Sequence, residues 1–213
     1  SVPSFGMSGS VSSIGKSGIV NLGSPDSSRD ATLVYMGSGE TSDKIIKVGA
    51  GSVARSISTL GATGGLILSA DLAMSGTAAL PKLTFSGDSA GNVFGGKIMD
   101  PSATTTTTVT KAGTGAWTFG GANTYKGTTT LNSSGGTLLI NGNQSAATGN
   151  VVVNSGATLG GKGVVGGSTT ILSGGKLAAG LATGSPKFNG NLALNAGATA
   201  IFEGVFPVNV AGQ

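Results

Sequence analysis

The feature that most constrains the fold is a short motif that returns about every 20 residues in the second half of the chain. In each copy an apolar residue is followed by small polar residues, a glycine turn and a second apolar segment. The equivalent glycines are Gly113, Gly135, Gly156, Gly174 and Gly197, separated by 22, 21, 18 and 23 residues. This spacing is typical of a β-solenoid, in which each coil stacks on the previous one.

Short runs of β-branched and aliphatic residues lie between these turns and predict strands. We predict strands at 137–140, 151–153, 169–172 and 192–194, and weaker ones at 66–69, 72–76 and 83–87. The dipeptides Asn141-Gly142, Gly160-Gly161, Gly166-Gly167 and Asn189-Gly190 indicate turns in which glycine adopts a positive φ. No segment has the apolar period of an amphipathic helix. Coils spaced about 4.8 Å apart would give an all-β solenoid of about nine or ten coils, roughly 45 Å long.

Composition excludes several function classes. The 213 residues include 40 glycines, 9% charged residues and 5% aromatic residues, so a core must consist mainly of small aliphatic layers. The chain has no His and no Cys, which removes the commonest general base, thiol nucleophiles and zinc–thiolate sites. The net charge is +4, but the ten lysines are scattered, so no nucleic-acid partner is expected.

Targeting signals are not evident in the sequence. No run of 18 apolar residues occurs, and the first residues lack the pattern of a signal peptide. We therefore expect no membrane span in this chain. A processed or excerpted secreted chain fits these observations.

A long and specific motif occupies residues 109–138. It contains Lys-x-Gly-x-Gly, Gly-Ala-Asn-Thr-Tyr-x-Gly and Gly-Thr-Leu in that order, and it resembles the autotransporter-associated β-strand repeat, also called the passenger-associated transport repeat. The motif residues are Lys111, Gly113, Gly115, Gly121, Ala122, Asn123, Thr124, Tyr125, Gly127, Gly136, Thr137 and Leu138. The resemblance is strong over 109–204 and weaker over 33–98. It implies a right-handed parallel β-helix of a bacterial outer-membrane or extracellular surface protein, with no catalytic residue and no cofactor.

The chain is expected to divide into four segments. Residues 1–30 are the least patterned and are predicted to form an N-terminal cap or extension. Residues 31–108 are predicted to form degenerate solenoid coils, and residues 109–204 the autotransporter-type repeats. Residues 205–213 are predicted to form a C-terminal strand that serves in assembly.

Motifs for catalysis or metal binding are weak in this sequence. Gly161–Gly166 matches a dinucleotide fingerprint and Ser10–Ser17 resembles a phosphate loop, but neither lies in a strand–helix unit. Pairs of acids, Asp26 with Asp30 or Glu40 with Asp43, are candidates for one cation, although solvated turn residues are the favoured interpretation. The remaining acids are Asp71, Asp88, Asp100 and Glu203, and their spacing does not follow the coil period. We predict no catalytic residue and no metal site.

Two function classes follow, with an enzyme acting on polysaccharide as a remote third. The first is an extracellular structural protein that assembles head to tail into a fibre as a homopolymer, because the apolar C-terminal region is suited to pack on a neighbour. The candidate interface residues are Ile201, Phe202, Val205, Phe206, Val208 and Val210. The second is a monomeric passenger stalk or adhesin that binds a glycan or cell surface, with Trp117 and Tyr125 as candidate ligand-stacking aromatics. The favoured interpretation of Trp117, Phe119 and Tyr125 is that two of the three pack inside or cap the solenoid.

Overall fold

The computed structural model describes residues 4–9, 12, 14–23, 29–49, 54–74, 81–133, 136–179 and 184–202. Within these ranges the chain forms 22 strands and no helix, and every strand pair is parallel. Nothing in the described ranges has the length and apolar character of a membrane-spanning helix. The predicted all-β parallel solenoid is therefore confirmed.

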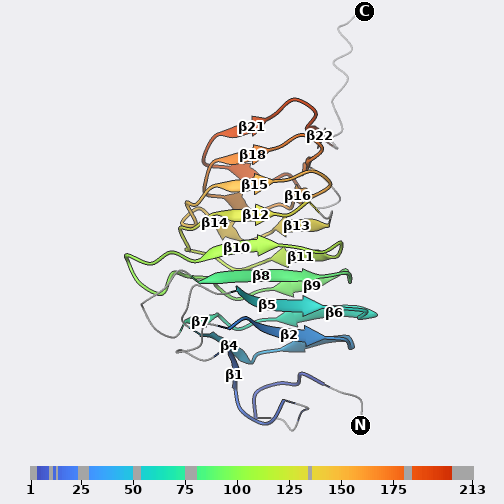
Figure 1. Ribbon diagram of the computed structural model, residues 1–213, viewed down its shortest axis with the longest axis vertical. Helices are drawn as coiled ribbons and strands as arrows, with labels where there is room; N and C mark the ends of the chain where they lie inside the picture. The colour runs from blue at the N-terminus through green and yellow to red at the C-terminus, as the bar shows by residue number, and fades with distance from the viewer. Residues whose placement is uncertain are drawn as a thin grey trace, which may run out of the picture.

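Two long sheets and two short ones make up the walls (Figure 1). The front sheet consists of β2 (Ala31–Tyr35), β5 (Ala54–Thr59), β8 (Lys82–Gly87), β10 (Thr108–Lys111), β12 (Thr129–Leu131), β15 (Val151–Val153), β18 (Thr169–Ile171) and β21 (Leu192–Leu194). The back sheet consists of β3 (Ser38–Ser42), β6 (Gly64–Leu68), β9 (Asn92–Phe94), β11 (Ala116–Phe119), β13 (Thr137–Ile140), β16 (Thr158–Gly160), β19 (Lys176–Ala179) and β22 (Thr199–Phe202).

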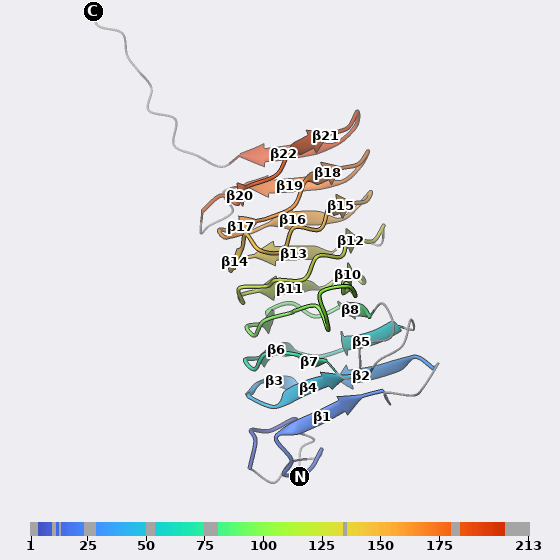
Figure 2. The same ribbon diagram turned by 90° about the vertical axis from the view of Figure 1, so that its left-hand side faces the viewer.

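A third side connects the back sheet to the front sheet of the next coil (Figure 2). It holds β1 (Ile19–Leu22), β4 (Ile45–Val48) and β7 (Ala73–Met74) in one short sheet. A second short sheet contains β14 (Asn143–Gln144), β17 (Val164–Val165) and β20 (Lys187–Phe188). In Figures 1 and 2 the chain runs rightward along the front sheet and returns along the back sheet while it rises toward the C-terminus, so the solenoid is right-handed.

The solenoid has fewer coils than the sequence predicts. Each long sheet stacks eight strands, which corresponds to about 7 turns, rather than the nine or ten predicted coils. Paired residues of the front sheet are 24, 28 and 26 positions apart in the first three turns, as in Arg55 and Leu83. They are 20, 22, 18 and 23 apart in the last four. The predicted repeat of about 20 residues is therefore correct for the second half of the chain and too short for the first half.

Alternation along the strands places every second side chain inside the solenoid. β10, β11 and β13 share a burial pattern in which every second residue is buried. In the front sheet one inward column runs through paired residues of successive coils: Leu33, Ile57, Phe85, Lys111, Leu131, Val153, Ile171 and Leu194. Because parallel strands in register superpose equivalent residues, similar side chains pack on one another from coil to coil.

Glycines at two corners allow the coils to approach each other. A Cβ atom at Gly121, Gly142 or Gly163 would overlap the carbonyl oxygen of the glycine one coil below. A second column behaves in the same way at Gly149 and Gly167. None of these five has a positive φ.

The turn dipeptides therefore contain glycine for two different reasons. Gly161 has a φ of 114°, as the sequence predicts. Gly142, Gly167 and Gly190 lack a positive φ, and the predicted reason for them is wrong. Their role is close backbone approach, since a Cβ there would collide with the coil below.

The neighbouring residues Gly120 and Gly121 provide a matched test of this corner constraint. A Cβ on Gly121 would overlap Gly96, whereas the nearest atom to a Cβ on Gly120 is 3.6 Å away. We expect Gly121→Ala to lower the free energy of unfolding by about 2 kcal/mol through overpacking. Gly120→Ala should stay within about 0.5 kcal/mol of the unsubstituted chain. Urea denaturation followed by circular dichroism measures both, and equal losses would contradict the corner constraint.

Candidate functional site

The family-motif residues build the wall of the solenoid. Lys111 ends β10 with its side chain inside, and its Nζ donates to the carbonyl oxygens of Ala112 and Gly113, each at 2.8 Å. Gly113 and Gly136 have φ values of 69° and 90°, so both glycines adopt the left-handed backbone conformation at the same turn of successive coils. Lys111 therefore satisfies two carbonyl groups of the turn, and the glycines allow the turn's backbone conformation.

Other motif residues form hydrogen bonds between coils or within one coil, or pack in the back sheet. The Oδ1 atom of buried Asn123 accepts a 2.8 Å hydrogen bond from the backbone N–H of Ile98, one coil below. The hydroxyl of Tyr125 shares a 2.6 Å hydrogen bond with the hydroxyl of Thr129. Thr137 and Leu138 lie in β13, with Leu138 buried beside Trp117 of the paired strand. The motif thus has a structural role in this chain.

The two aromatic residues predicted to stack on a ligand lie in the interior. Trp117 is 0% exposed and Tyr125 is 2% exposed. The Trp117 Nε1 donates to the Ser86 carbonyl at 3.0 Å, and its ring meets Phe85 edge-on with centroids 5.0 Å apart. A stacking platform needs a ring face open to solvent, so the structure corrects this prediction. Alternation in β11 sends Trp117 inward with Phe119.

The carboxylates of the described chain hold backbone N–H groups. Asp30, Asp71, Asp88 and Asp100 each accept from an N–H of another segment, for example Lys97 to Asp71 at 2.7 Å. No group of three or more acids in the described ranges is arranged for a metal ion. Asp26 and Glu203 lie outside these ranges. These described acids therefore hold the connections between strands through hydrogen bonds. The interpretation as solvated turn residues did not include this role.

Glu40 and Asp43 fasten the N-terminal residues to the first coil. Glu40 accepts from the N–H of Phe5 at 2.6 Å and of Gly6 at 3.1 Å, and Asp43 accepts from the N–H of Ser8 at 2.6 Å. Burial raises the pKa of Glu40, but these hydrogen bonds outweigh burial and the net pKa is lowered. Hydrogen bonds from Ser8 lower the pKa of Asp43. The same two acids that are candidates for a cation therefore hold a terminal segment.

A buried lysine completes this N-terminal attachment. Lys44 is 1% exposed, and its Nζ donates to the carbonyl oxygens of Gly15 at 3.0 Å and Ser17 at 2.6 Å. Phe5 is buried in the core. The N-terminal end is thus partly closed by residues 4–9 and 14–18.

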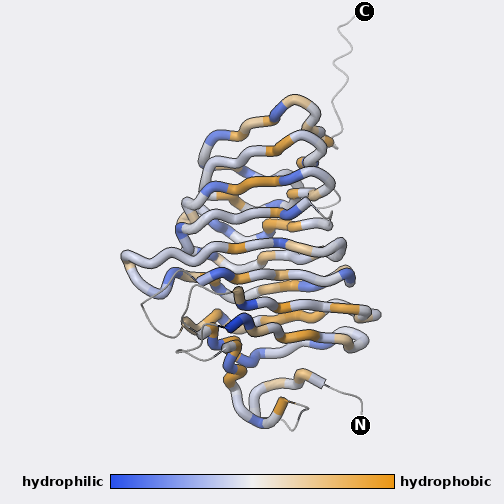
Figure 3. Tube along the Cα trace, viewed as in Figure 1, coloured by the Kyte–Doolittle hydropathy of each residue, from blue (hydrophilic) through white to orange (hydrophobic). Residues whose placement is uncertain are grey.

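The last described rung, at the C-terminal end, is more exposed. Leu192 and Leu194 of β21 pair with Thr169 and Ile171, which are buried, yet are 38% and 48% exposed themselves. In β22, Ile201 is 42% exposed and Phe202 is 63% exposed. Figure 3 shows apolar residues on this last rung at the end opposite the N-terminus. Val205, Phe206, Val208 and Val210 of the predicted interface lie outside the described residues.

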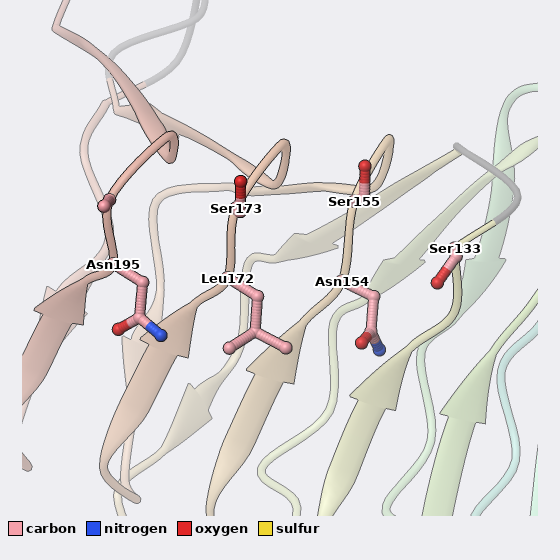
Figure 4. Close-up of a pocket in the computed structure, with 7 residues that line it drawn as sticks. Ser133, Asn154, Ser155, Leu172, Ser173 and Asn195 are labelled. Carbon is pink, nitrogen blue, oxygen red and sulfur yellow. The ribbon is translucent and has the colours of Figure 1, made fainter.

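A shallow groove of about 630 Å³, lined mainly by serine and asparagine residues, runs across the turns that follow the front-sheet strands (Figure 4). Equivalent turn positions of successive coils line it, and their side chains form two rows in Figure 4. The lining residues are Ser133, Asn154, Ser155, Leu172, Ser173, Asn195 and Ala196. Asn154 donates through Nδ2 to the Leu131 carbonyl at 2.7 Å, while the three serines are exposed. The groove presents repeated hydroxyl and amide groups to solvent.

Two buried groups set the response of stability to alkaline pH. Burial lowers the pKa of Lys111 to about 8, so between pH 8 and 10.5 the unfolded chain holds a proton that the folded chain has released. We expect the free energy of unfolding to rise across this window. Burial raises the pKa of Tyr125 to about 12, so above pH 10 the folded state binds more protons and the free energy falls. Tyr35, whose pKa burial also raises, adds to that fall.

Substitution separates these two contributions. Lys111→Met should abolish the rise between pH 8 and 10.5, and Tyr125→Phe should reduce the fall above pH 10. Urea denaturation at half-unit steps of pH measures both. A rise that persists unchanged in Lys111→Met would contradict the assignment.

Comparison with known proteins agrees with the fold. Over 96 residues the chain is 40% identical to "Adhesin BmaC autotransporter" of Brucella suis biovar 1 (strain 1330). The match covers 45% of this chain and 3% of that protein, so the chain spans only a small part of the adhesin's length. No protein-family model matches the chain, and no solved structure matches it. The parallel solenoid and this match together confirm the predicted resemblance to autotransporter-associated β-helix repeat proteins.

Proposed function

We propose that this chain is a structural β-solenoid of a bacterial surface or extracellular protein and that it assembles head to tail through its two ends. The observation that carries the proposal is the open last rung, where Leu194 and Phe202 are 48% and 63% exposed. The relative is named an autotransporter adhesin, which supports a surface role rather than an enzymatic one. The stacked coils supply a stiff rod.

The last rung has the properties of an unprotected edge. The strands β21 and β22 each have a paired strand on one side only within the described chain. Neither strand contains a charged residue or a proline, the features that usually protect a sheet edge. A further coil or a second copy that pairs there would cover Leu192, Leu194, Ile201 and Phe202. Since the two ends differ and lie at opposite ends of one stack, such a contact repeats along the axis and builds a filament.

A charge on the last rung tests the assembly. The unsubstituted chain should form concentration-dependent polymers in sedimentation velocity and filaments in negative-stain electron microscopy. Phe202→Lys and truncation after Gly204 should each abolish them, because both remove apolar area from the joint. Ser155→Lys, on an exposed turn away from both ends, is the control. Polymers that persist in both altered chains would exclude this end as the joint.

Adhesion by a monomeric passenger stalk is the second candidate function. The name of the relative and the Ser/Asn groove favour it, since repeated hydroxyl and amide groups suit hydrogen bonds to a glycan. The contacts would lie in this groove rather than at Trp117 and Tyr125. A polysaccharide-active enzyme has less support, because the described acids bind backbone N–H groups instead of facing a common cleft.

A glycan array tests adhesion. The unsubstituted chain should bind at least one surface polysaccharide, and the double substitution Ser155→Lys with Ser173→Lys should remove binding by placing long side chains across the groove. Thr118→Lys, at an outward position of β11, should leave it intact. Binding that survives the groove substitutions would place the ligand elsewhere on the chain.

A further inference from the structure

An apolar groove lies at the N-terminal end, between the N-terminal residues and β2. It encloses about 530 Å³, and no charged side chain lines it. The lining residues are Ser4, Phe5, Ile14, Leu33, Val34, Tyr35, Met36, Gly37, Ser38 and Thr63. Val34 is 47% exposed and Met36 is 71% exposed, and together with Ile14 they form an exposed apolar patch of the kind that marks interaction sites.

The groove runs beside a free strand edge. Within the described chain, β2 is hydrogen-bonded to a strand, β5, on one side only. The opposite side of β2 faces the N-terminal segment that Glu40 and Asp43 hold, and Figure 1 shows this segment below the first coil. An extended peptide in the groove could therefore pair with β2 and bury alternate side chains, which is the arrangement of β-strand addition.

The chain itself contains a peptide of this chemistry. Residues 203–213 have the sequence Glu-Gly-Val-Phe-Pro-Val-Asn-Val-Ala-Gly-Gln, with apolar residues at Val205, Phe206, Val208 and Val210 and a single charge. In the sequence this segment follows β22, and β22 lies at the opposite end of the solenoid from the groove. Its proline lacks an N–H, which is tolerated in a strand at the edge of a sheet.

The length of the segment decides which copy it can reach. Seven steps of about 4.8 Å place the first and last rungs about 34 Å apart along the axis. From Phe202 to Phe206 the chain extends at most about 14 Å. Phe206 therefore cannot reach the groove of its own copy, whereas a second copy stacked on the C-terminal end brings its groove next to the segment.

We propose that the groove beside β2 receives residues 203–213 of a second copy of this chain. This inference rests on the proposed head-to-tail assembly and identifies the acceptor site for it. Val34, Met36 and Ile14 form the apolar wall against which Val205 and Phe206 of the second copy pack.

Cysteine cross-linking tests the proposal, because the chain has no Cys of its own. One copy carries Met36→Cys and a differently tagged copy carries Phe206→Cys. After mixing and mild oxidation, we expect the Met36–Phe206 heterodimer at a yield at least about tenfold above that of a Ser155→Cys copy mixed with the same partner, since docking raises the effective concentration of the two thiols. Peptide mapping verifies the linked residues.

Parallel sedimentation of the unsubstituted chain separates two kinds of failure. If that chain polymerises but the cross-link yield equals the Ser155 control, the groove is not the acceptor and the head-to-tail proposal stands. If the unsubstituted chain stays monomeric and no cross-link forms, both proposals fail. Val34→Lys with Met36→Lys changes only exposed side chains and should abolish polymers when the groove is the acceptor. Polymers that persist in this variant overturn the inference.

Discussion

The rest of the structure depends on the parallel hydrogen-bonded ladder that joins each coil to the next. It fixes the distance between coils at about 4.8 Å wherever strands pair. At the corners, where the chain turns from one sheet to another, that distance leaves no room for a Cβ above a carbonyl oxygen. Gly121, Gly142 and Gly163 occupy one such corner. The high glycine content is thus a consequence of stacking, and only part of it concerns backbone conformation.

Stacking also determines what the interior can contain. A narrow solenoid has little volume per coil, so most inward side chains are aliphatic. Near the middle of the solenoid, Phe94, Trp117 and Phe119 pack around Phe85 in an aromatic cluster. Many of the buried polar groups bond to the backbone. Lys44 and Lys111 donate to turn carbonyls, and the carboxylates accept N–H groups of neighbouring coils. With few charges available, the chain uses them to fasten connections between coils.

The same ladder makes the two ends unequal. At the N-terminal end, Glu40, Asp43 and Lys44 hold residues that cover part of the first coil, with Phe5 in the core. At the C-terminal end, β21 and β22 repeat the inward apolar positions of the coils below without a described coil above them. Free edges of parallel sheets invite further strands. The two ends of the described solenoid therefore differ, and the stack has a direction.

The local features of this protein can be predicted from its sequence. The strands at 137–140, 151–153 and 192–194 are correct to the residue, because a strand and its turn are encoded by adjacent residues. Contacts between coils, in contrast, set the complete burial of Trp117, the length of up to 28 residues in the first turns and the need for glycine at Gly142. Tertiary structure also created the groove beside β2. These features depend on which residues stack across coils, and that register is set by contacts between residues 18 to 28 positions apart.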